Sequence, residues 1–152
     1  MDFIGLDFGV HFTTPQYTRN DTYGIVTDHV TNLEWQDNET VSKPWVTQAN
    51  YDAGNYANTS GDTASTYCSN LSLGGGGWRL PTVKELLFIV DNGKYSPSID
   101  SQFQNTISSY YWSSTSNASY TSYAWYVDFY NGNTYYYNKS NSFYVRCVRA
   151  GQ

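Results

Sequence analysis

Few side chains in this sequence could carry out acid, base or nucleophilic chemistry. The two histidines, His11 and His29, both lie near the N-terminus, and surface or turn positions account for them. Ser113 and Ser114 follow Trp112, but no Gly-x-Ser-x-Gly motif, the turn that exposes a serine nucleophile, surrounds them. The sequence therefore predicts no catalytic residue, and we expect a protein that is not an enzyme.

Candidate ligands for a metal ion or a phosphate group are equally sparse. Asp91, Asn92 and Asp100 offer oxygen atoms of the kind that calcium prefers, but turn capping explains these residues better. The Glu-Pro-Asn and Trp-Asn-Asp triplets of calcium-dependent lectins do not occur. The four glycines at residues 74–77 are not followed by Lys-Ser or Lys-Thr, so they predict a helix end rather than a phosphate-binding loop. We expect neither a metal ion nor a cofactor.

The two cysteines, Cys68 and Cys147, stand too far apart for a Cys-x-x-Cys redox motif or for the close spacing of a zinc site. A structural disulfide, a pair of buried free thiols and a pair of reactive thiols are the alternatives. Of these the disulfide is favoured, and we predict that the two cysteines are joined.

Aromatic residues dominate the composition. The chain has 152 residues, which fits one domain, and its 16 Tyr, 7 Phe and 5 Trp make up 18% of it, whereas charged residues make up 14%. The rings supply enough apolar area for a core although aliphatic side chains are few. A net charge of −5 and the lack of clustered Lys and Arg argue against a nucleic-acid partner, because phosphate contacts need clustered positive charge.

No segment is long enough to cross a membrane as a helix. The longest apolar runs, such as residues 86–90, are far shorter than the roughly 20 residues required. Residues 1–10 are apolar, but they contain Asp2 and Asp7 and no Lys or Arg, so they do not resemble a secretory signal peptide. We expect no membrane insertion and no signal peptide in this chain.

The first half of the chain predicts a hairpin and then two helices. Residues 24–27 and 32–36 have the pattern of two short strands joined by a turn. Residues 38–62 are polar and show no period, so we expect a long surface excursion anchored by Trp45. Asp62 is the expected N-cap of the first helix, which we expect to end at Leu71.

The second helix has the clearest local signal. Thr82 and Glu85 form a capping box after Pro81. The helix is expected to end at residues 91–93. Its expected apolar face consists of Leu86, Leu87, Ile89 and Val90.

The second half of the chain predicts strands, at residues 110–114, 123–130, 133–138 and 143–149. Strands that follow a hairpin and two helices are typical of an α+β fold with an antiparallel sheet. Asn131-Gly132 is a strong signal for a two-residue type I′ turn, which would pair Tyr130 with Asn133.

This register gives the hairpin two different faces. Trp125, Val127 and Phe129 share one face, which we expect to join the core. We expect the other face to meet solvent, although a covering loop is the alternative. Four tyrosines and no aliphatic residue on that face favour an exposed contact surface. Its members are Tyr126, Asp128, Tyr130, Asn133, Tyr135 and Tyr137.

Five segments stand in order along the chain: Leu33-Glu34-Trp35-Gln36-Asp37, Thr66-Tyr67-Cys68, Trp78-Arg79-Leu80-Pro81-Thr82 with Glu85-Leu86, Tyr111-Trp112-Ser113-Ser114-Thr115, and Val145-Arg146-Cys147-Val148-Arg149. Together they resemble the Lcl C-terminal domain family. The resemblance begins near Asp21, so residues 1–20 are an N-terminal extension and residues 21–152 the domain. The family's cysteines fall on Cys68 and Cys147, whereas Glu34 stands where the family usually has methionine, a departure that concerns local packing.

The resemblance implies a C-type-lectin-like fold of the formylglycine-generating type. The family includes the variable proteins of diversity-generating retroelements, in which mutagenic copying at adenines rewrites codons near the C-terminus and leaves the fold intact. Randomising the adenines of an Asn codon never gives Trp, Lys, Glu, Gln or Met. Of these types, residues 116–144 contain only Trp125 and Lys139. The composition is therefore consistent with diversification of this region.

We expect a surface-displayed binding domain, on a cell or a virus particle, whose partner is a protein or glycan on another cell. Tyr gives a large contact area at low entropic cost, while Ser and Asn adapt their hydrogen bonds. The alternatives are a calcium-dependent carbohydrate-binding lectin and an invariant adhesin domain. Arg79, Arg146 and Arg149 are expected to be structural charges paired inside the protein. The expected ligand contacts are Asn117, Ser119, Tyr120, Ser122, Tyr126, Asp128, Tyr130, Asn133, Tyr135 and Tyr137.

Overall fold

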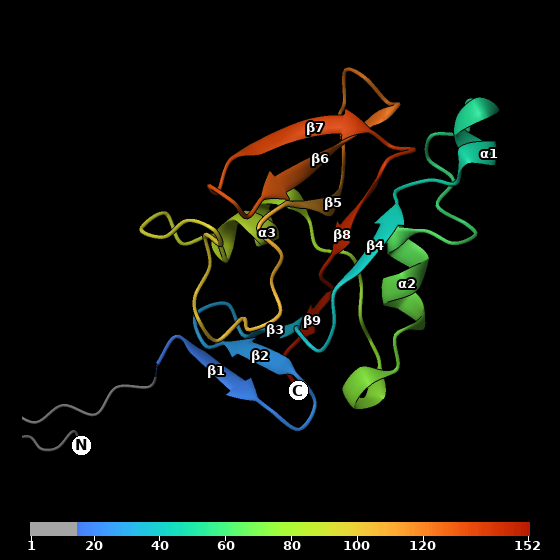
Figure 1. Ribbon diagram of the computed structural model, residues 1–152. Helices are drawn as coiled ribbons and strands as arrows, with labels where there is room; N and C mark the ends of the chain where they lie inside the picture. Colours follow the sequence, from blue (N-terminus) through green and yellow to red (C-terminus); the bar gives the residue numbers. More distant parts are fainter. Residues whose placement is uncertain (1–14) are drawn as a thin grey trace, which may run out of the picture.

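The computed structural model describes residues 15–152, which form two sheets and three short helices (Figure 1). The strands are β1 (Tyr17–Asn20), β2 (Ile25–Asp28), β3 (Leu33–Gln36), β4 (Val41–Pro44), β5 (Tyr110–Ser116), β6 (Tyr123–Asp128), β7 (Thr134–Asn138), β8 (Ser142–Val145) and β9 (Val148–Ala150). The helices are α1 (Gln48–Asp52), α2 (Ala64–Asn70) and α3 (Val83–Phe88), with a 3-10 turn at Leu73–Gly75. The predicted α+β class is confirmed. His11 and residues 1–10, on which the signal-peptide prediction rests, lie outside the described residues.

The two sheets lie at different ends of the molecule. Sheet A has the strand order β1-β2-β3-β9 and is antiparallel throughout. Sheet B has the order β4-β8-β5-β6-β7, and within it β5 and β8 run parallel. The β6–β7 hairpin forms the end of the molecule opposite sheet A (Figure 1). Because β9 pairs with β3, the last strand of the described chain completes the sheet that the first three strands form.

The predicted N-terminal hairpin is confirmed as β2 and β3, in which Val26 lies opposite Trp35. The sequence does not predict β1, because Tyr17–Asn20 contains no aliphatic residue. β1 pairs with β2 along its whole length, so the expected boundary between residues 20 and 21 falls within sheet A.

Residues 38–62 are not one irregular excursion, and that prediction is wrong. They contain β4, which pairs with β8, and α1, which begins after the N-cap Thr47. The partner of β4 comes about a hundred residues later, so no local pattern marks the strand. Trp45 is the predicted anchor: it is buried, and its Nε1 donates to the carbonyl oxygen of Ser113 at 2.8 Å.

Capping boxes begin the two longer helices. In α3 the Thr82 hydroxyl accepts the N–H of Glu85 at 3.2 Å and the Glu85 carboxylate accepts the N–H of Thr82 at 2.9 Å, as predicted. In α2 the N-cap is Thr63 rather than Asp62, because Thr63 and Thr66 form the reciprocal pair. α3 ends at Phe88, earlier than expected, and α2 ends at Asn70. Of the expected apolar face, Leu86 and Ile89 are buried, Val90 is half-buried and Leu87 is exposed.

The prediction of one strand at residues 143–149 is wrong. The segment crosses from sheet B, as β8, to sheet A, as β9, with the buried Arg146 and Cys147 between them. Cys147 forms the predicted disulfide with Cys68 of α2, and their Cα atoms are 5.5 Å apart. The disulfide therefore ties α2 to the junction of the two sheets.

Aromatic rings fill both parts of the core. One cluster surrounds the disulfide and contains Trp45, Trp78 and Trp112. The other contains Trp35 and Phe129. No helix among residues 15–152 has the length and apolar character that crossing a bilayer requires.

Candidate functional site

The β6–β7 hairpin has a different register from the predicted one. Tyr126 lies opposite Tyr135 and Val127 opposite Thr134, so the pairing is shifted by two residues. Five residues, 129–133, separate the two strands, and the predicted two-residue turn is wrong. Because the shift is an even number, each strand residue keeps the face that the sequence predicts.

Two side chains account for the longer loop. The Asp128 carboxylate accepts the N–H of Tyr130 at 2.9 Å, which closes a turn before Asn131-Gly132 can form one. Phe129 is fully buried, and its N–H donates to the carbonyl oxygen of Ser109 at 2.9 Å. Because its side chain is buried in the core, Phe129 does not take part in the pairing of β6 with β7.

One side of sheet B carries a continuous group of aromatic rings, which we call the tyrosine face. It consists of Tyr110, Tyr126, Tyr135, Tyr137 and Phe143. The ring of Tyr126 lies 4.5 Å from that of Tyr110 and 5.2 Å from that of Phe143, measured between centroids. Tyr137 extends the group, with its ring 5.7 Å from that of Phe143. The face thus joins side chains from β5, β6, β7 and β8.

The members of the tyrosine face differ in exposure. Tyr135 and Tyr137 are 57% and 49% exposed, as expected for contact residues. Tyr126 is 9% exposed, so the expectation that it points freely into solvent is wrong: the rings of Tyr110 and Phe143 pack over it. Burial raises the pKa of Tyr126 to about 12, with smaller contributions from nearby Tyr110 and Asp128.

A shallow pocket of about 600 Å³ lies at the loop end of the tyrosine face. Four expected contact residues line it, namely Tyr126, Asp128, Asn133 and Tyr135, together with Gly132 and Thr134. Tyr130 lies outside this pocket; it is 50% exposed, and its ring is 6.4 Å from that of Tyr95. The structure therefore gathers four of the expected contacts at one concavity.

Aromatic rings also lie on the other side of the border strand β7. Tyr136 stacks on Tyr123 at 5.6 Å and on Tyr135 at 4.5 Å, so rings continue around the edge of sheet B. Trp125, which we expected in the core, is half-buried and packs against Tyr136 at 5.1 Å. The sequence does not show that β7 is a border strand, and for this reason we expected this side to join the core.

The loop between β5 and β6 has mixed roles. Asn117 is buried, and its side-chain oxygen accepts the N–H of Ser119 at 2.9 Å and of Tyr120 at 3.1 Å, so it shapes the loop. Ser119 and Tyr120 are exposed, Tyr120 by 58%. Ser122 is half-buried, and its carbonyl oxygen accepts the N–H of Lys139. Of the four expected contacts in this loop, Ser119 and Tyr120 are the accessible ones.

Residues 24–149 match the model of the Lcl C-terminal domain family. The chain belongs to this family. Among the curated proteins we found no match for the chain.

The family segments build the scaffold of this Lcl C-terminal domain. Trp35 and Trp112 are fully buried, and the cysteines of two further segments form the disulfide. The exposed tyrosines of β7 lie outside these segments. The segments that carry the resemblance therefore lie mainly in the core and its polar supports.

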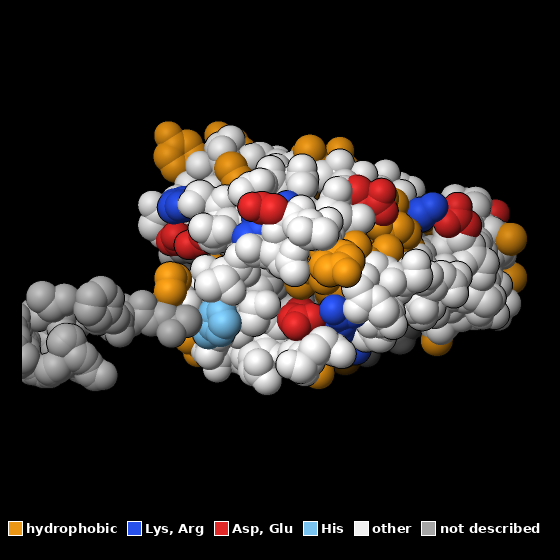
Figure 2. All heavy atoms as spheres, turned by 90° about the horizontal axis from the view of Figure 1, so that it is seen from below, with side chains coloured by type: hydrophobic (Ala, Val, Ile, Leu, Met, Phe, Trp, Pro, Cys, Tyr) orange, Lys and Arg blue, Asp and Glu red, His pale blue; other side chains and the backbone are white. Residues whose placement is uncertain are grey.

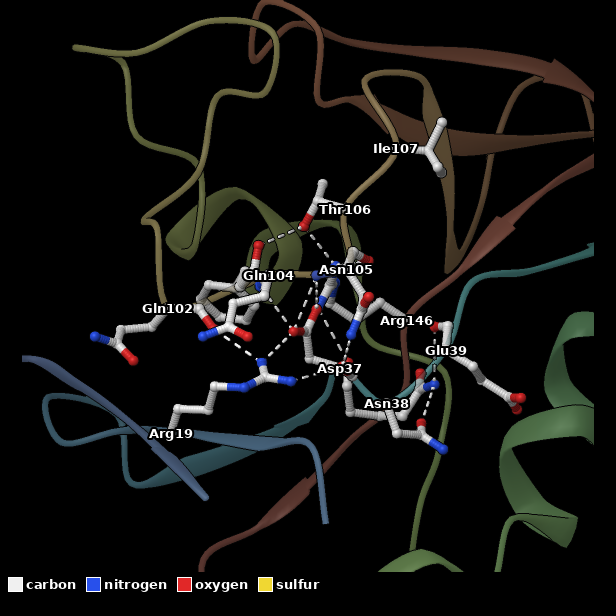
Figure 3. Close-up of polar contacts among 12 residues, drawn as sticks. Arg19, Asp37, Asn38, Glu39, Gln102, Gln104, Asn105, Thr106, Ile107 and Arg146 are labelled. Atoms are coloured by element: carbon white, nitrogen blue, oxygen red, sulfur yellow. Dashed lines mark hydrogen bonds and ion pairs between the residues drawn. The ribbon is translucent and has the colours of Figure 1, made fainter. Parts of the chain in front are cut away.

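The main polar support is a buried carboxylate held between two arginines (Figure 3). Asp37 is fully buried; its Oδ1 accepts from Arg146 at 2.6 Å and its Oδ2 accepts from Arg19. The N–H of Gln104 donates to the same carboxylate at 2.8 Å, and Arg146 also donates to the hydroxyl of Thr106 at 2.8 Å. Every bond is internal, so the cluster joins both ends of the chain to the loop before β5. The predicted structural role of Arg146 is confirmed.

Arg149 explains the glycine run of this Lcl C-terminal domain. Its Nη1 donates to three carbonyl oxygens of residues 73–76, at 2.7 to 3.2 Å, and its guanidinium lies 4.4 Å from the centroid of the Trp78 ring. Glu34 accepts from its Nε at 2.8 Å, which gives the departure from the family's methionine a structural reason. Two of the four glycines, Gly74 and Gly76, thus present carbonyl oxygens to a cation, the reverse of a phosphate loop.

Arg79 differs from the expectation of a buried charge. Its side chain is 50% exposed and forms two bonds of 2.7 Å to the carboxylate of Glu85. This pairing lowers the pKa of Glu85. Arg79 therefore supports the start of α3 from the surface.

Lys139 is a buried cation that the sequence reasoning missed. It is 1% exposed; its Nζ donates to the carbonyl oxygen of Tyr56 at 2.9 Å and to the hydroxyl of Ser116 at 2.7 Å, and lies 4.1 Å from the Trp45 ring. Among the described residues no carboxylate pairs with it. Desolvation lowers the pKa of Lys139 to about 8. It fixes the end of β7 to the core.

The remaining candidates for chemistry are dispersed. The Oγ of Ser113 donates to the carbonyl oxygen of Trp125 at 2.6 Å, and His29 is exposed and bonds the hydroxyl of Thr18. Within residues 15–152, no three His, Cys, Asp or Glu side chains lie close enough together to hold a metal ion. On the face at the sheet A end, charges of both signs lie in small mixed groups (Figure 2).

Proposed function

We propose that this Lcl C-terminal domain is a non-enzymatic binding domain whose contact surface is the accessible part of the tyrosine face with the neighbouring loops. One observation carries the proposal: exposed Tyr135 lines a pocket of about 600 Å³ on sheet B, and exposed Tyr137 lies two residues further along the same strand. Exposed aromatic area of this kind is usually a contact surface in soluble proteins. The neighbouring loops add two accessible rings: Tyr130, which is 50% exposed, and Tyr120, which is 58% exposed and stacks on Tyr136 on the other side of β7.

The chemistry of this surface suits an uncharged partner surface, either protein or glycan. Between residues 101 and 144 the charged side chains are Asp128 and Lys139, and Lys139 is buried. Tyrosine rings bind through large amphipathic area, with Asn133 and Ser119 available to adapt hydrogen bonds. Recognition would therefore rest on shape and hydrogen bonding rather than on charge.

We further propose a C-type-lectin-like fold for the domain and display outside the cell, on a cell surface or a virus particle. The pairing of β3 with β9 supports the fold, because it holds the two ends of the domain together while the chain between them forms sheet B. The Cys68–Cys147 disulfide supports display in an oxidising environment, where such bonds persist.

Retroelement diversification of the surface is part of the same proposal. The residue types that adenine mutagenesis of Asn codons cannot produce occur in residues 116–144 only at Trp125 and Lys139. Lys139 is buried and Trp125 half-buried, so both serve the scaffold. A template repeat that differs from this region only at adenines, beside a reverse transcriptase in the neighbouring DNA, would support the idea, and its absence would contradict it.

Binding arrays test the contact surface directly. The labelled domain is applied to arrays of glycans and of purified cell-surface proteins, together with a Tyr135→Ser/Tyr137→Ser variant. Tyr23→Ser is the matched control, since Tyr23 is also 50% exposed but lies in the β1–β2 turn. We expect signals that the double variant loses and the control keeps. Signals that survive in the double variant, or none at all, would contradict the proposal.

A further inference from the structure

A second, smaller pocket lies where the described chain begins. It has a volume of about 300 Å³, and residues before β1, in β1, at the end of α3 and in the following loops line it. Its polar lining consists of Gln16, Tyr17, Asp91, Asn92 and Asp100, and Phe88 forms part of the apolar wall. We call it the acidic pocket. It shares no lining residue with the pocket of the tyrosine face.

A third carboxylate lies behind the lining. Asp28 is directly opposite Tyr17 in the β1–β2 ladder, so the two side chains share a face of sheet A. Asp28 is 1% exposed; its Oδ1 accepts the N–H of Val30 at 2.9 Å and the side-chain amide of Gln16 at 3.4 Å. Its Oδ2 is buried and has no hydrogen-bond partner among the described residues. A buried carboxylate oxygen without a partner is costly unless a donor reaches it.

The two carboxylates of the lining also keep an oxygen free. Asp91 uses Oδ1 to accept the N–H of Gly93 at 2.9 Å, and Asp100 uses Oδ1 to accept the N–H of Gln102 at 2.8 Å. Within residues 15–152, neither of them nor Asp28 belongs to an ion pair. Turn capping therefore explains each of these acidic or amide side chains separately. It does not explain why three carboxylates from separate elements lie near one pocket without a cation.

Tyr17 connects the three carboxylates, because it lies opposite Asp28 in the β1–β2 ladder and lines the pocket together with Asp91 and Asp100. Its pKa is raised to about 12, first by burial and then by the negative charges of Asp28, Asp100 and Asp91. The three carboxylates thus act on one phenol oxygen at the pocket wall. A cation at the same place would be stabilised by all three.

We propose that the acidic pocket binds an organic cation, the guanidinium group of an arginine side chain on a partner protein. The pocket is larger than a bare ion needs, and the carboxylates are too far apart to ligate one metal ion together. A guanidinium has five donors in a planar fork, which can reach acceptors on several walls, and the rings of Tyr17 and Phe88 offer it aromatic surface. This inference does not depend on the function of the tyrosine face.

Titration with ethylguanidinium, monitored by the amide NMR signals of the isotope-labelled protein, tests the proposal. Ethylurea is the neutral probe of the same shape. We expect saturable shifts at residues 16–17, 91–93 and 100 with ethylguanidinium and none with ethylurea. Binding should lower the pKa of Tyr17, measured by ultraviolet titration of its phenol, because the cation offsets the carboxylates.

Variants locate the site. Asp28→Asn and Asp100→Asn should each weaken ethylguanidinium binding about fivefold or more, because each removes one of three charges. Two variants are used so that a folding defect in one does not decide the result. Asp52→Asn, an exposed position in α1, makes the same change in net charge and should leave the affinity unchanged. Equal shifts with ethylurea, unchanged affinity in both pocket variants, or calcium saturating the same signals at lower concentration would overturn the proposal.

Discussion

Tyr126 and Tyr135 lie directly opposite each other across β6 and β7, yet Tyr126 is 9% exposed and Tyr135 is 57% exposed. β6 has a neighbouring strand on each side, and the rings of Tyr110 and Phe143 cover Tyr126. β7 is the border strand of sheet B, so nothing from a further strand packs against Tyr135. The position of a strand in the sheet therefore separates scaffold tyrosines from accessible ones.

This difference predicts different costs of ring removal. Tyr135→Ala and Tyr137→Ala should each lower the free energy of unfolding by about 1 kcal/mol or less, because their rings are half in solvent. Tyr126→Ala should cost about 3 kcal/mol through lost burial and a cavity, and Phe129→Ala about 3–5 kcal/mol. Urea titrations of the four variants measure these values. Equal costs at Tyr126 and Tyr135 would show that the two rings are packed alike.

The disulfide should contribute a large share of the stability. Cys68 and Cys147 are separated by 79 positions, and closing a loop of that length stabilises by about 4 kcal/mol in the chain-entropy model. Replacing both with Ser should lower the free energy of unfolding by that order, as measured by guanidinium titration. Reductant should weaken the natural protein and leave the double Ser variant unchanged. Two free thiols in the natural protein, found by intact-mass analysis, would contradict the prediction.

Lys139 should make stability rise with pH in the mildly alkaline range. Its pKa is about 8 in the folded protein and 10.5 as the ordinary value, so above pH 8 the folded state binds fewer protons than the unfolded one. The free energy of unfolding should increase by about 1–2 kcal/mol between pH 7.5 and 9.5. Above pH 10 the raised pKa values of Tyr17 and Tyr126 act in the opposite direction.

Lys139→Met provides the control for this prediction. The variant keeps a long side chain over Trp45 but cannot titrate, so its stability should be nearly flat over the same pH range. Chemical denaturation at pH 7.5, 8.5 and 9.5 compares the two proteins. A rise of equal size in the variant would assign the pH dependence to another group.

Calcium should not stabilise the protein. The described residues contain no cluster of ligands for a metal ion, and Asp91 and Asp100 each use one oxygen to cap their own turn. Thermal melts with calcium and with a chelator should therefore coincide. A calcium-induced rise of several degrees would favour the calcium-dependent lectin.

Local signals made parts of this fold predictable. The Thr82–Glu85 capping box and the hairpin of β2 and β3 depend on residues a few positions apart, and both are confirmed. The disulfide is predictable because the chain has only one pair of cysteines. The alternation of the hairpin strands also gives the correct face for most residues, although the register is wrong.

The wrong predictions concern features that depend on residues far apart in the sequence. Burial of Phe129 overrides the Asn131-Gly132 turn signal, and β4 forms only because β8 returns beside it. The sequence from β8 to β9 has the pattern of one strand, but the burial of Arg146 beside Asp37 separates it into two strands in different sheets. The acidic pocket has only a partial signal: Asp91, Asn92 and Asp100 stand out in the sequence, but the strands β1 and β2 bring Tyr17 and Asp28 beside them.

A comparison of two surface-display libraries distinguishes contact tyrosines from scaffold residues. One randomises Tyr120, Tyr130, Tyr135 and Tyr137, and the other randomises four buried positions, Tyr111, Trp112, Val127 and Phe129. The measured quantity is the fraction of members that remain folded after heating. We predict that most members of the first library survive like the natural domain, because the scaffold does not need these rings, and that nearly all members of the second are lost. Similar losses in both libraries would contradict the account, since the exposed tyrosines would then belong to the scaffold rather than to a contact surface.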